Sequence, residues 1–263
     1  MQGFDWRQFP LDLLIERKES HRISVCIPAR DEATTVGGVV RAIRTALMRP
    51  GCELVDELIV VDDRSVDATG ERAARAGARV VRSEHDAIDA IDAIDEGKGG
   101  AMARGVRASS GDIVVFLDGD VENFDARFVT GLVGPLLVGP RTMLVKASYD
   151  RPLNSHGAGG GRVTELVARP LISLYFPELE TIRQPLAGET ATRRSVLDEV
   201  TLAPGYGVEL ALLIDVLGRY GREAIAQVDL GERMHRNRPL DQLVPQARDV
   251  LRAGLDRAGV PAR

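Results

Sequence analysis

The chain has 263 residues, of which 44% are hydrophobic and 28% are charged, and its formal net charge is -5. This length and composition predict one large domain with a sizeable core. The acidic balance argues against a protein whose whole surface attracts nucleic acid or an anionic membrane. Only two cysteines are present, and no apolar run approaches the roughly 20 residues that a membrane-spanning helix needs. We therefore expect a cytoplasmic protein without a disulfide framework and without nucleic-acid or membrane partners.

The first half of the chain alternates apolar runs with segments of helical periodicity. Residues 1–22 are a leader segment in which a short surface helix is expected. Beyond it the sequence predicts a strand over 23–27, a helix over 33–48, a strand over 57–61, a helix over 66–76 and a strand over 78–81. This order is typical of parallel βαβ units and therefore of a Rossmann-like nucleotide-binding sheet. The Ala-Ile-Asp repeat at 87–95 is expected to be a mobile surface loop without a chemical role.

A central strand is predicted over 113–117, where five apolar residues stand between Gly111-Asp112 and Asp118-Gly119-Asp120. A continuous apolar run of this length indicates a strand that is buried on both faces. Ligands bind at the carboxyl ends of strands in open α/β sheets, so Asp118 and Asp120 are predicted to face a site. Two carboxylates separated by one residue could share a metal-bound polyanionic ligand. The alternative is an Asp-Gly-Asp turn that merely ends the strand.

Two glycine-rich segments are candidates for phosphate binding. Gly97-Lys98-Gly99 begins a helix but is not a Walker A loop, because the upstream glycine and the Ser/Thr after the lysine are missing. A lysine beside a helix N-terminus can still meet a diphosphate. The run Gly159-Gly160-Gly161 precedes Arg162 and a helix start, which suits a phosphate or a carboxylate. The alternative for this run is a flexible linker between the two halves of the chain.

The second half continues the α/β pattern. The sequence predicts a helix over 124–137, a strand over 142–147, a helix over 165–170, a glycine-rich turn at 203–209 that enters an apolar helix to 217, a strand over 225–230 and an amphipathic helix over 241–258. His235 follows the last strand and comes just before Arg236, Asn237 and Arg238, so it is better placed to act as a ligand than a lone histidine is. We expect one continuous domain with two parts, 23–150 and 151–263.

The ordered motifs at 28–32, 61–69, 97–99 and 111–120 together resemble those of the GT-A glycosyltransferases, whose Asp-x-Asp motif holds a divalent ion under a nucleotide diphosphate sugar. The second-half motifs at 159–170, 184–189, 203–209 and 235–240 resemble those of the glucosyl-3-phosphoglycerate synthase family and its mannosyl-transferring relatives. The resemblance extends from about residue 23 to 254. It implies a GT-A fold whose 23–150 half binds the nucleotide sugar and whose 151–263 half binds the acceptor. It also implies a homodimer that transfers a hexose, with retention, to the 2-hydroxyl of D-3-phosphoglycerate.

The resemblance also implies roles for individual residues. The nucleotide sugar would contact Pro28, Ala29, Arg30, Glu32, Asp63, Lys98, Asp118, Gly119, Asp120 and Tyr206. Mg²⁺ or Mn²⁺ would be held by Asp120 and His235. The acceptor would be bound by Gly161, Arg162, Thr164 and Asn237. Glu209 is, with Asp120, the catalytic candidate and would position the sugar or accept a proton; the alternative is a carboxylate stabilised at a helix N-terminus.

Three questions stay open from the sequence. Strict UDP-glucose users are expected to have a small residue at position 63, whereas Asp63 could accept a hydrogen bond from uracil N3 or from two adjacent guanine donors. GDP-mannose, GDP-glucose and UDP-glucose are therefore all candidate donors. The acceptor could instead be a polyprenyl phosphate or a polysaccharide end. A non-catalytic nucleotide-binding protein on the same sheet is the third possibility.

Overall fold

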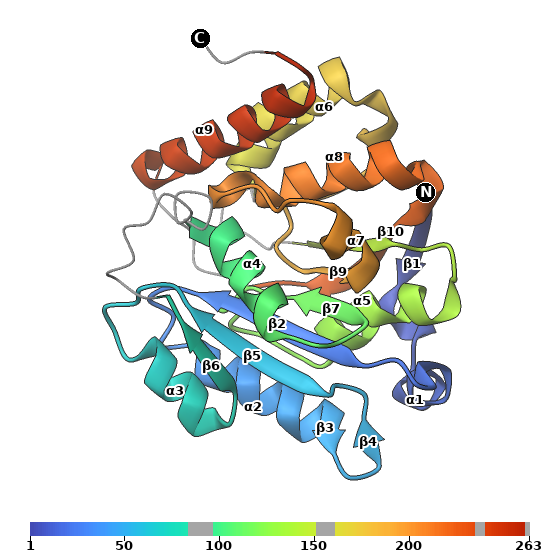
Figure 1. Ribbon diagram of the computed structural model, residues 1–263, viewed down its shortest axis with the longest axis vertical. Helices are drawn as coiled ribbons and strands as arrows, with labels where there is room; N and C mark the ends of the chain where they lie inside the picture. Colours follow the sequence, from blue (N-terminus) through green and yellow to red (C-terminus); the bar gives the residue numbers. More distant parts are fainter. Residues whose placement is uncertain (84–96, 151–160, 235–239, 261–263) are drawn as a thin grey trace.

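The computed structural model describes residues 1–83, 97–150, 161–234 and 240–260, and in the last range the side chains from residue 243 onward. Within these residues the chain forms an eight-stranded sheet with helices on both faces and a hairpin of β3 (Met48–Arg49) and β4 (Cys52–Glu53) (Figure 1). The main sheet has the spatial order β1 (Gln2–Asp5), β10 (Ile225–Glu232), β8 (Leu144–Asp150), β9 (Thr190–Arg193), β7 (Ile113–Phe116), β2 (Ile23–Ala29), β5 (Glu57–Asp62) and β6 (Arg79–Arg82). The predicted Rossmann-like α/β architecture is confirmed.

The sheet is parallel except at β9, which runs antiparallel to both of its neighbours, β7 and β8. The sequence did not predict β9, because its four residues, Thr-Ala-Thr-Arg, contain no apolar run. The sequence also did not predict β1, which pairs with β10 and joins the leader segment to the sheet. Expecting only a surface helix in residues 1–22 was therefore incomplete, although the helix itself is present as α1 (Leu11–Lys18).

Helices cover the sheet in two layers. On one face lie α1, α2 (Val36–Leu47), α3 (Thr69–Ala76) and α5 (Arg127–Val138), and their buried residues form one apolar core with the sheet. On the other face lie α4 (Gly97–Ala108), α6 (Arg169–Tyr175), α7 (Arg194–Glu199), α8 (Val208–Tyr220) and α9 (Leu240–Arg257), which form a second core (Figure 1). Among the residues that the structure describes, no helix is long and apolar enough to span a bilayer.

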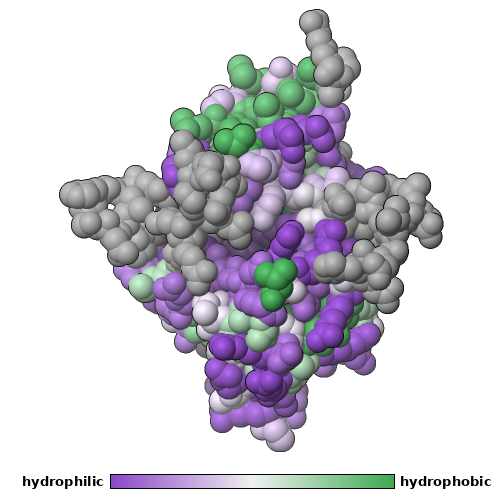
Figure 2. Space-filling view, turned by 90° about the vertical axis from the view of Figure 1, so that its left-hand side faces the viewer, coloured by the Kyte–Doolittle hydropathy of each residue, from purple (hydrophilic) through white to green (hydrophobic). Residues whose placement is uncertain are grey.

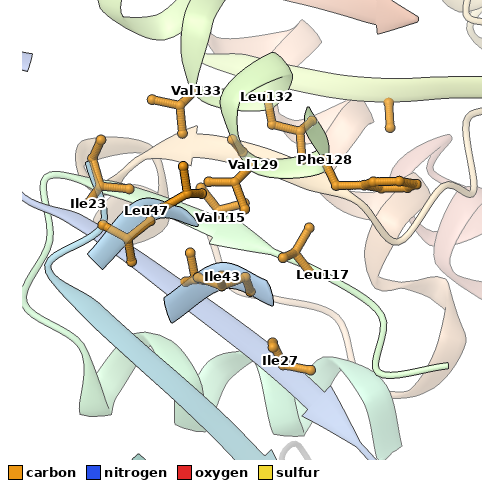
Figure 3. Packing of buried hydrophobic residues seen from close by; sticks show 14 of the residues in the cluster. Ile23, Ile27, Ile43, Leu47, Val115, Leu117, Phe128, Val129, Leu132 and Val133 are labelled. Atoms are coloured by element: carbon orange, nitrogen blue, oxygen red, sulfur yellow. The ribbon is translucent and has the colours of Figure 1, made fainter. Parts of the chain in front are cut away.

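The central strands have side chains in both cores. Ile113 and Val115 of β7 point to the α2 and α5 face, whereas Val114 and Phe116 point to the opposite face. Figure 3 shows Val115 against residues of α2 and α5 such as Leu47 and Val129. Because successive strand residues face opposite sides, a strand buried on both faces needs an unbroken apolar run. This confirms the prediction that the run before Asp118 is a central strand.

The second half agrees with the predicted elements, apart from boundaries of a few residues. The predicted helix at 165–170 is a π-helical turn, η2 (Thr164–Ala168), that continues into α6. Short 3-10 turns complete the chain as η1 (Trp6–Gln8), η3 (Pro177–Leu179), η4 (Gly205–Gly207) and η5 (Arg222–Ala224). The Ala-Ile-Asp repeat at 87–95 and the segment 151–160 lie outside the described residues.

Candidate active site

The carboxyl ends of three adjacent strands, β2, β5 and β7, open into one cleft of about 290 Å³. Pro28 and Ala29 end β2, Asp63 follows β5, and Asp118 follows β7 after one residue. This edge of the sheet lies at the left of Figure 1, and Figure 2 turns it towards the viewer, with hydrophilic residues across its middle. The opposite wall comes from residues 161–164, from the start of α8 and from α9. A cleft at the carboxyl edge of an open sheet is the usual ligand site of this architecture.

The structure brings together every predicted site residue that it describes. The cleft is lined by Pro28, Ala29, Arg30, Glu32, Asp63, Lys98, Asp118, Gly119, Asp120, Gly161, Arg162, Thr164, Tyr206 and Glu209. His235 and Asn237 lie outside the described residues. Placement in one cleft is what the sequence predicted; the separate donor, acceptor and catalytic roles stay predictions.

Lys98 joins the Asp-Gly-Asp motif to α8. It lies in the first turn of α4, and its Nζ is 2.6 Å from Asp118 Oδ1 and 2.7 Å from Glu209 Oε1. Burial opposes the charge on the ammonium, but the two carboxylates outweigh burial and raise the Lys98 pKa well above its ordinary value. Lys98 therefore supplies a permanent positive charge at the floor of the cleft. Glu209 lies in the first turn of α8, so the helix-terminus interpretation of this carboxylate also holds.

Arg233 is a site residue that the sequence analysis missed. It directly follows β10, only 3% of it is exposed, and its NH2 lies 2.8 Å from Asp118 Oδ2 and 2.9 Å from Asp120 Oδ1. Its Nε donates to Glu189 Oε1 at 2.7 Å. More than a hundred residues separate Arg233 from Asp118, so no local spacing could reveal the pair. The available signal was its position, two residues before His235 at the end of a strand.

Lys146 was also missed, because it lies inside a strand that was predicted correctly. It is buried in β8, and its Nζ donates to the Ala187 carbonyl at 2.5 Å and to Thr190 Oγ1 at 2.9 Å. Burial lowers its pKa to about 8. A lysine in an apolar strand was the available signal. Lys146 fixes the turn at 184–189, whose Leu186 lines the cleft.

Gly188 of the same turn packs directly on the charged floor. A Cβ at this position would lie 2.2 Å from Asp118 Oδ1 and 2.5 Å from Lys98 Nζ. Only a residue without a side chain permits this approach. The turn therefore limits the space in which the Lys98–Asp118 pair can move.

Asp63 forms a second charged group, at the β5 side of the cleft. Its Oδ1 lies 3.0 Å from Arg104 NH2 and 3.5 Å from Arg64 Nε, and it accepts a hydrogen bond from Ser83 Oγ at 3.2 Å. Arg104 is on α4, the helix that also supplies Lys98. These contacts hold the carboxylate at the edge where a nucleoside base is expected.

The donor set at the end of β7 fits a hard divalent cation. Asp118 and Asp120 present carboxylate oxygens that are partly exposed to the cleft. Mg²⁺ commonly binds one or two protein carboxylates and completes its shell with water and substrate phosphates. Within the described ranges, no group of three or more His, Cys, Asp and Glu side chains is arranged to hold a metal. Further ligands would come from a bound diphosphate or from His235.

The comparisons with known proteins agree with this geometry. The model of the family described as "Glycosyl transferase family 2" matches residues 24–200. The chain therefore belongs to glycosyl transferase family 2, and the predicted GT-A fold is confirmed.

Individual relatives place the chain in one group within family 2. Glucosyl-3-phosphoglycerate synthase of Mycolicibacterium paratuberculosis is 51% identical over 251 residues, which cover 93% of this chain and 74% of that protein. The crystal structure of the Mycobacterium tuberculosis enzyme with Mn²⁺, UDP-glucose and phosphoglyceric acid matches with a TM-score of 0.86 at 44% identity, over 100% of this chain and 89% of that chain. A second structure of that enzyme, with Mg²⁺ and UDP, has a TM-score of 0.87 at 44% identity and covers 99% of this chain and 88% of that chain. Within family 2, this chain is a member of the glucosyl-3-phosphoglycerate synthases, so the prediction of an enzyme rather than a non-catalytic binding protein is confirmed.

Proposed function

We propose that the protein transfers glucose from UDP-glucose to the 2-hydroxyl of D-3-phosphoglycerate, with retention and with Mg²⁺ or Mn²⁺. The observation that carries the proposal is the network in which Lys98 and Arg233 converge on Asp118 at the end of β7. The ligands bound by the M. tuberculosis relative support UDP-glucose over the two GDP donors. Phosphoglyceric acid in the same complex supports this acceptor over a polyprenyl phosphate or a polysaccharide end.

The donor would lie along the carboxyl ends of the strands. Asp63, held by Arg104, would accept a hydrogen bond from uracil N3, next to Pro28 and Ala29. Asp118 would then lie near the ribose. The diphosphate would extend towards Lys98 and Arg233, since a dianion is best placed beside two buried cations.

The positive charges in the site would promote departure of the nucleotide. Transfer would break the bond between the anomeric carbon and the diphosphate oxygen and form a bond from that carbon to the acceptor 2-oxygen. The hydroxyl proton would pass to the departing diphosphate or to Glu209, and negative charge would be left on the diphosphate. Lys98 and Arg233 would stabilise this charge where it develops. A divalent cation, held by Asp120 and His235, would supply Lewis-acid stabilisation of the same group. Glu209, fixed 2.7 Å from Lys98, would position the sugar.

The acceptor would occupy the opposite wall. Arg162 presents a planar guanidinium that can bind a phosphate or a carboxylate through two hydrogen bonds, and Thr164 adds a hydroxyl. Gly161 has a φ of 86°, a conformation that favours glycine and that begins the helical segment carrying both residues. Asn237 would complete this set.

The experiment that tests the function is transfer by the purified protein with Mn²⁺ and D-3-phosphoglycerate, with UDP-glucose, GDP-glucose and GDP-mannose in parallel. Mass spectrometry and NMR would identify the product and its anomeric configuration. We expect α-linked glucosyl-3-phosphoglycerate from UDP-glucose. A faster reaction with a GDP sugar would contradict the donor assignment, and nucleotide binding without any product would contradict the acceptor.

A further inference from the structure

The Arg233 guanidinium is held from three sides. Its NH2 faces the Asp118 and Asp120 carboxylates, at 2.8 and 2.9 Å. Its Nε donates to Glu189 Oε1 at 2.7 Å. Its Cζ lies 5.3 Å from the centre of the Tyr149 ring. One cation thus touches both carboxylates of the Asp-Gly-Asp motif through NH2, while a third carboxylate holds its Nε.

Glu189 has no contact with solvent, and both of its oxygens have donors. Its relative exposure is 0%, Oε1 accepts from Arg233, and Oε2 accepts from the Tyr149 hydroxyl at 2.9 Å. The Glu189 carbonyl also accepts from the Ala147 amide at 3.1 Å, which fixes the backbone. Because a buried carboxylate is unfavourable unless it is paired, this geometry marks Glu189 as the counter-charge of Arg233.

A divalent cation and Arg233 would compete for the Asp120 carboxylate. A guanidinium within 3 Å of Asp118 and Asp120 repels a second cation there, unless its charge is offset from another side. Glu189 provides that offset at Nε, the neighbouring nitrogen of the same guanidinium. With Glu189 in place, the guanidinium can keep its position beside the diphosphate when a cation arrives.

We propose that Glu189, braced by Tyr149, is a positioning residue that holds Arg233 and offsets its charge, so that Asp120 of the Asp-Gly-Asp motif can bind a divalent cation. The inference rests on the proposed function, because it assumes a metal at the Asp-Gly-Asp motif. The effect of Glu189 on Mn²⁺ affinity, however, can be measured without donor or acceptor.

The test is a double-mutant cycle on Mn²⁺ affinity, measured by electron paramagnetic resonance without nucleotide. Glu189→Gln should weaken Mn²⁺ binding by about tenfold, and Arg233→Gln should strengthen it by about tenfold. In the Arg233→Gln background, Glu189→Gln should change the affinity by less than about twofold, because the charge that Glu189 offsets is gone. An equal effect of Glu189→Gln in both backgrounds, or no effect in either, would overturn the proposal.

Two further variants separate positioning from folding. Tyr149→Phe removes only the hydroxyl that holds Glu189 Oε2, and we expect it to weaken Mn²⁺ binding by about twofold to threefold even if Glu189→Gln does not fold. Unchanged affinity in Tyr149→Phe would count against the proposal. Glu71→Gln, at an exposed ion pair on α3, is the matched control and should leave the affinity unchanged. If the wild type forms the glucosylated product but the cycle is additive, or the wild type binds no Mn²⁺ without nucleotide, the positioning role fails and the proposed function stands. A wild type that forms no product with Mn²⁺ overturns the proposed function.

Discussion

Each charged side chain at the floor of the cleft has a partner of opposite sign. Lys98 pairs with Asp118 and Glu209, and Arg233 pairs with Glu189 through Nε. Such pairs hold side chains in one geometry, which matters more for catalysis than their net contribution to stability. Removing one partner should therefore lower turnover, and it should also cost stability because the other charge is left unpaired.

Lys98→Met removes the charge of the ammonium and keeps a side chain of similar size. Since Lys98 would stabilise the departing diphosphate, we expect kcat to fall by about 10²-fold to 10³-fold, with little change in the KM for phosphoglycerate. Steady-state kinetics with both substrates varied would measure the two parameters. A change in the acceptor KM alone would contradict the role of Lys98 at the donor.

Lys146 makes folding stability depend on pH. Its pKa is about 8 in the folded protein and ordinarily 10.5, so between these values the unfolded chain binds a proton that the folded chain has lost. Stability therefore rises with pH across this window, by about 1.4 kcal/mol per pH unit relative to Lys146→Met. Urea unfolding of both proteins at pH 7.5 and 9.5 gives the difference. A difference that falls with pH, or stays flat, would contradict a buried, protonatable Lys146.

At the scale of elements, two connections shape the cleft. The helix α4 provides Lys98 for the motif and Arg104 for Asp63, and the turn at 184–189 passes directly over the Lys98–Asp118 pair. This turn leads into β9, the antiparallel strand that binds β7 to β8. The position of the turn is thus fixed by the sheet.

Gly188→Ala tests this close approach. The new Cβ would displace the Lys98 and Asp118 side chains, and misplacement by about 1 Å can lower turnover by about 10²-fold. Circular dichroism should show an intact fold. Gly218→Ala on α8 is the matched control, because nothing lies within 4 Å of its Cβ position. Equal activity of the two variants would show that the turn does not constrain the site.

The sequence identified site residues where they lie next to a recognisable local pattern. The apolar run before Asp118 and the Gly-Lys-Gly at the start of α4 each identify both an element and a site residue. The sequence was uninformative where the partner is distant. Nothing around Thr190 predicts β9, because its ladder with two neighbouring strands determines it. Arg233, Glu189 and Lys146 became site residues only once the sheet had brought β8, β9 and β10 beside β7.

At the scale of the whole molecule, residues from both halves of the chain line the same cleft. The β2, β5 and β7 ends carry the residues predicted to bind the donor, and residues 161–164 form the facing wall. Arg233, from the end of β10, crosses to the motif and links the halves. Both halves are therefore needed for one site.

The homodimer expected from the family resemblance is a prediction at this scale. Sedimentation equilibrium at micromolar concentration should give about twice the chain mass of 28.5 kDa. A mass of one chain at all concentrations would contradict a dimer, without bearing on the cleft itself.

We propose that the carboxylates at the end of β7 make this cleft a metal-dependent glucosyltransferase site. The most direct measurement is product formation from UDP-glucose and D-3-phosphoglycerate across a Mn²⁺ titration, for the wild type and for Asp120→Ala, with circular dichroism as the control for folding. We predict that the variant folds like the wild type and forms no product at any Mn²⁺ concentration. Unchanged Mn²⁺-dependent turnover in Asp120→Ala would contradict the account.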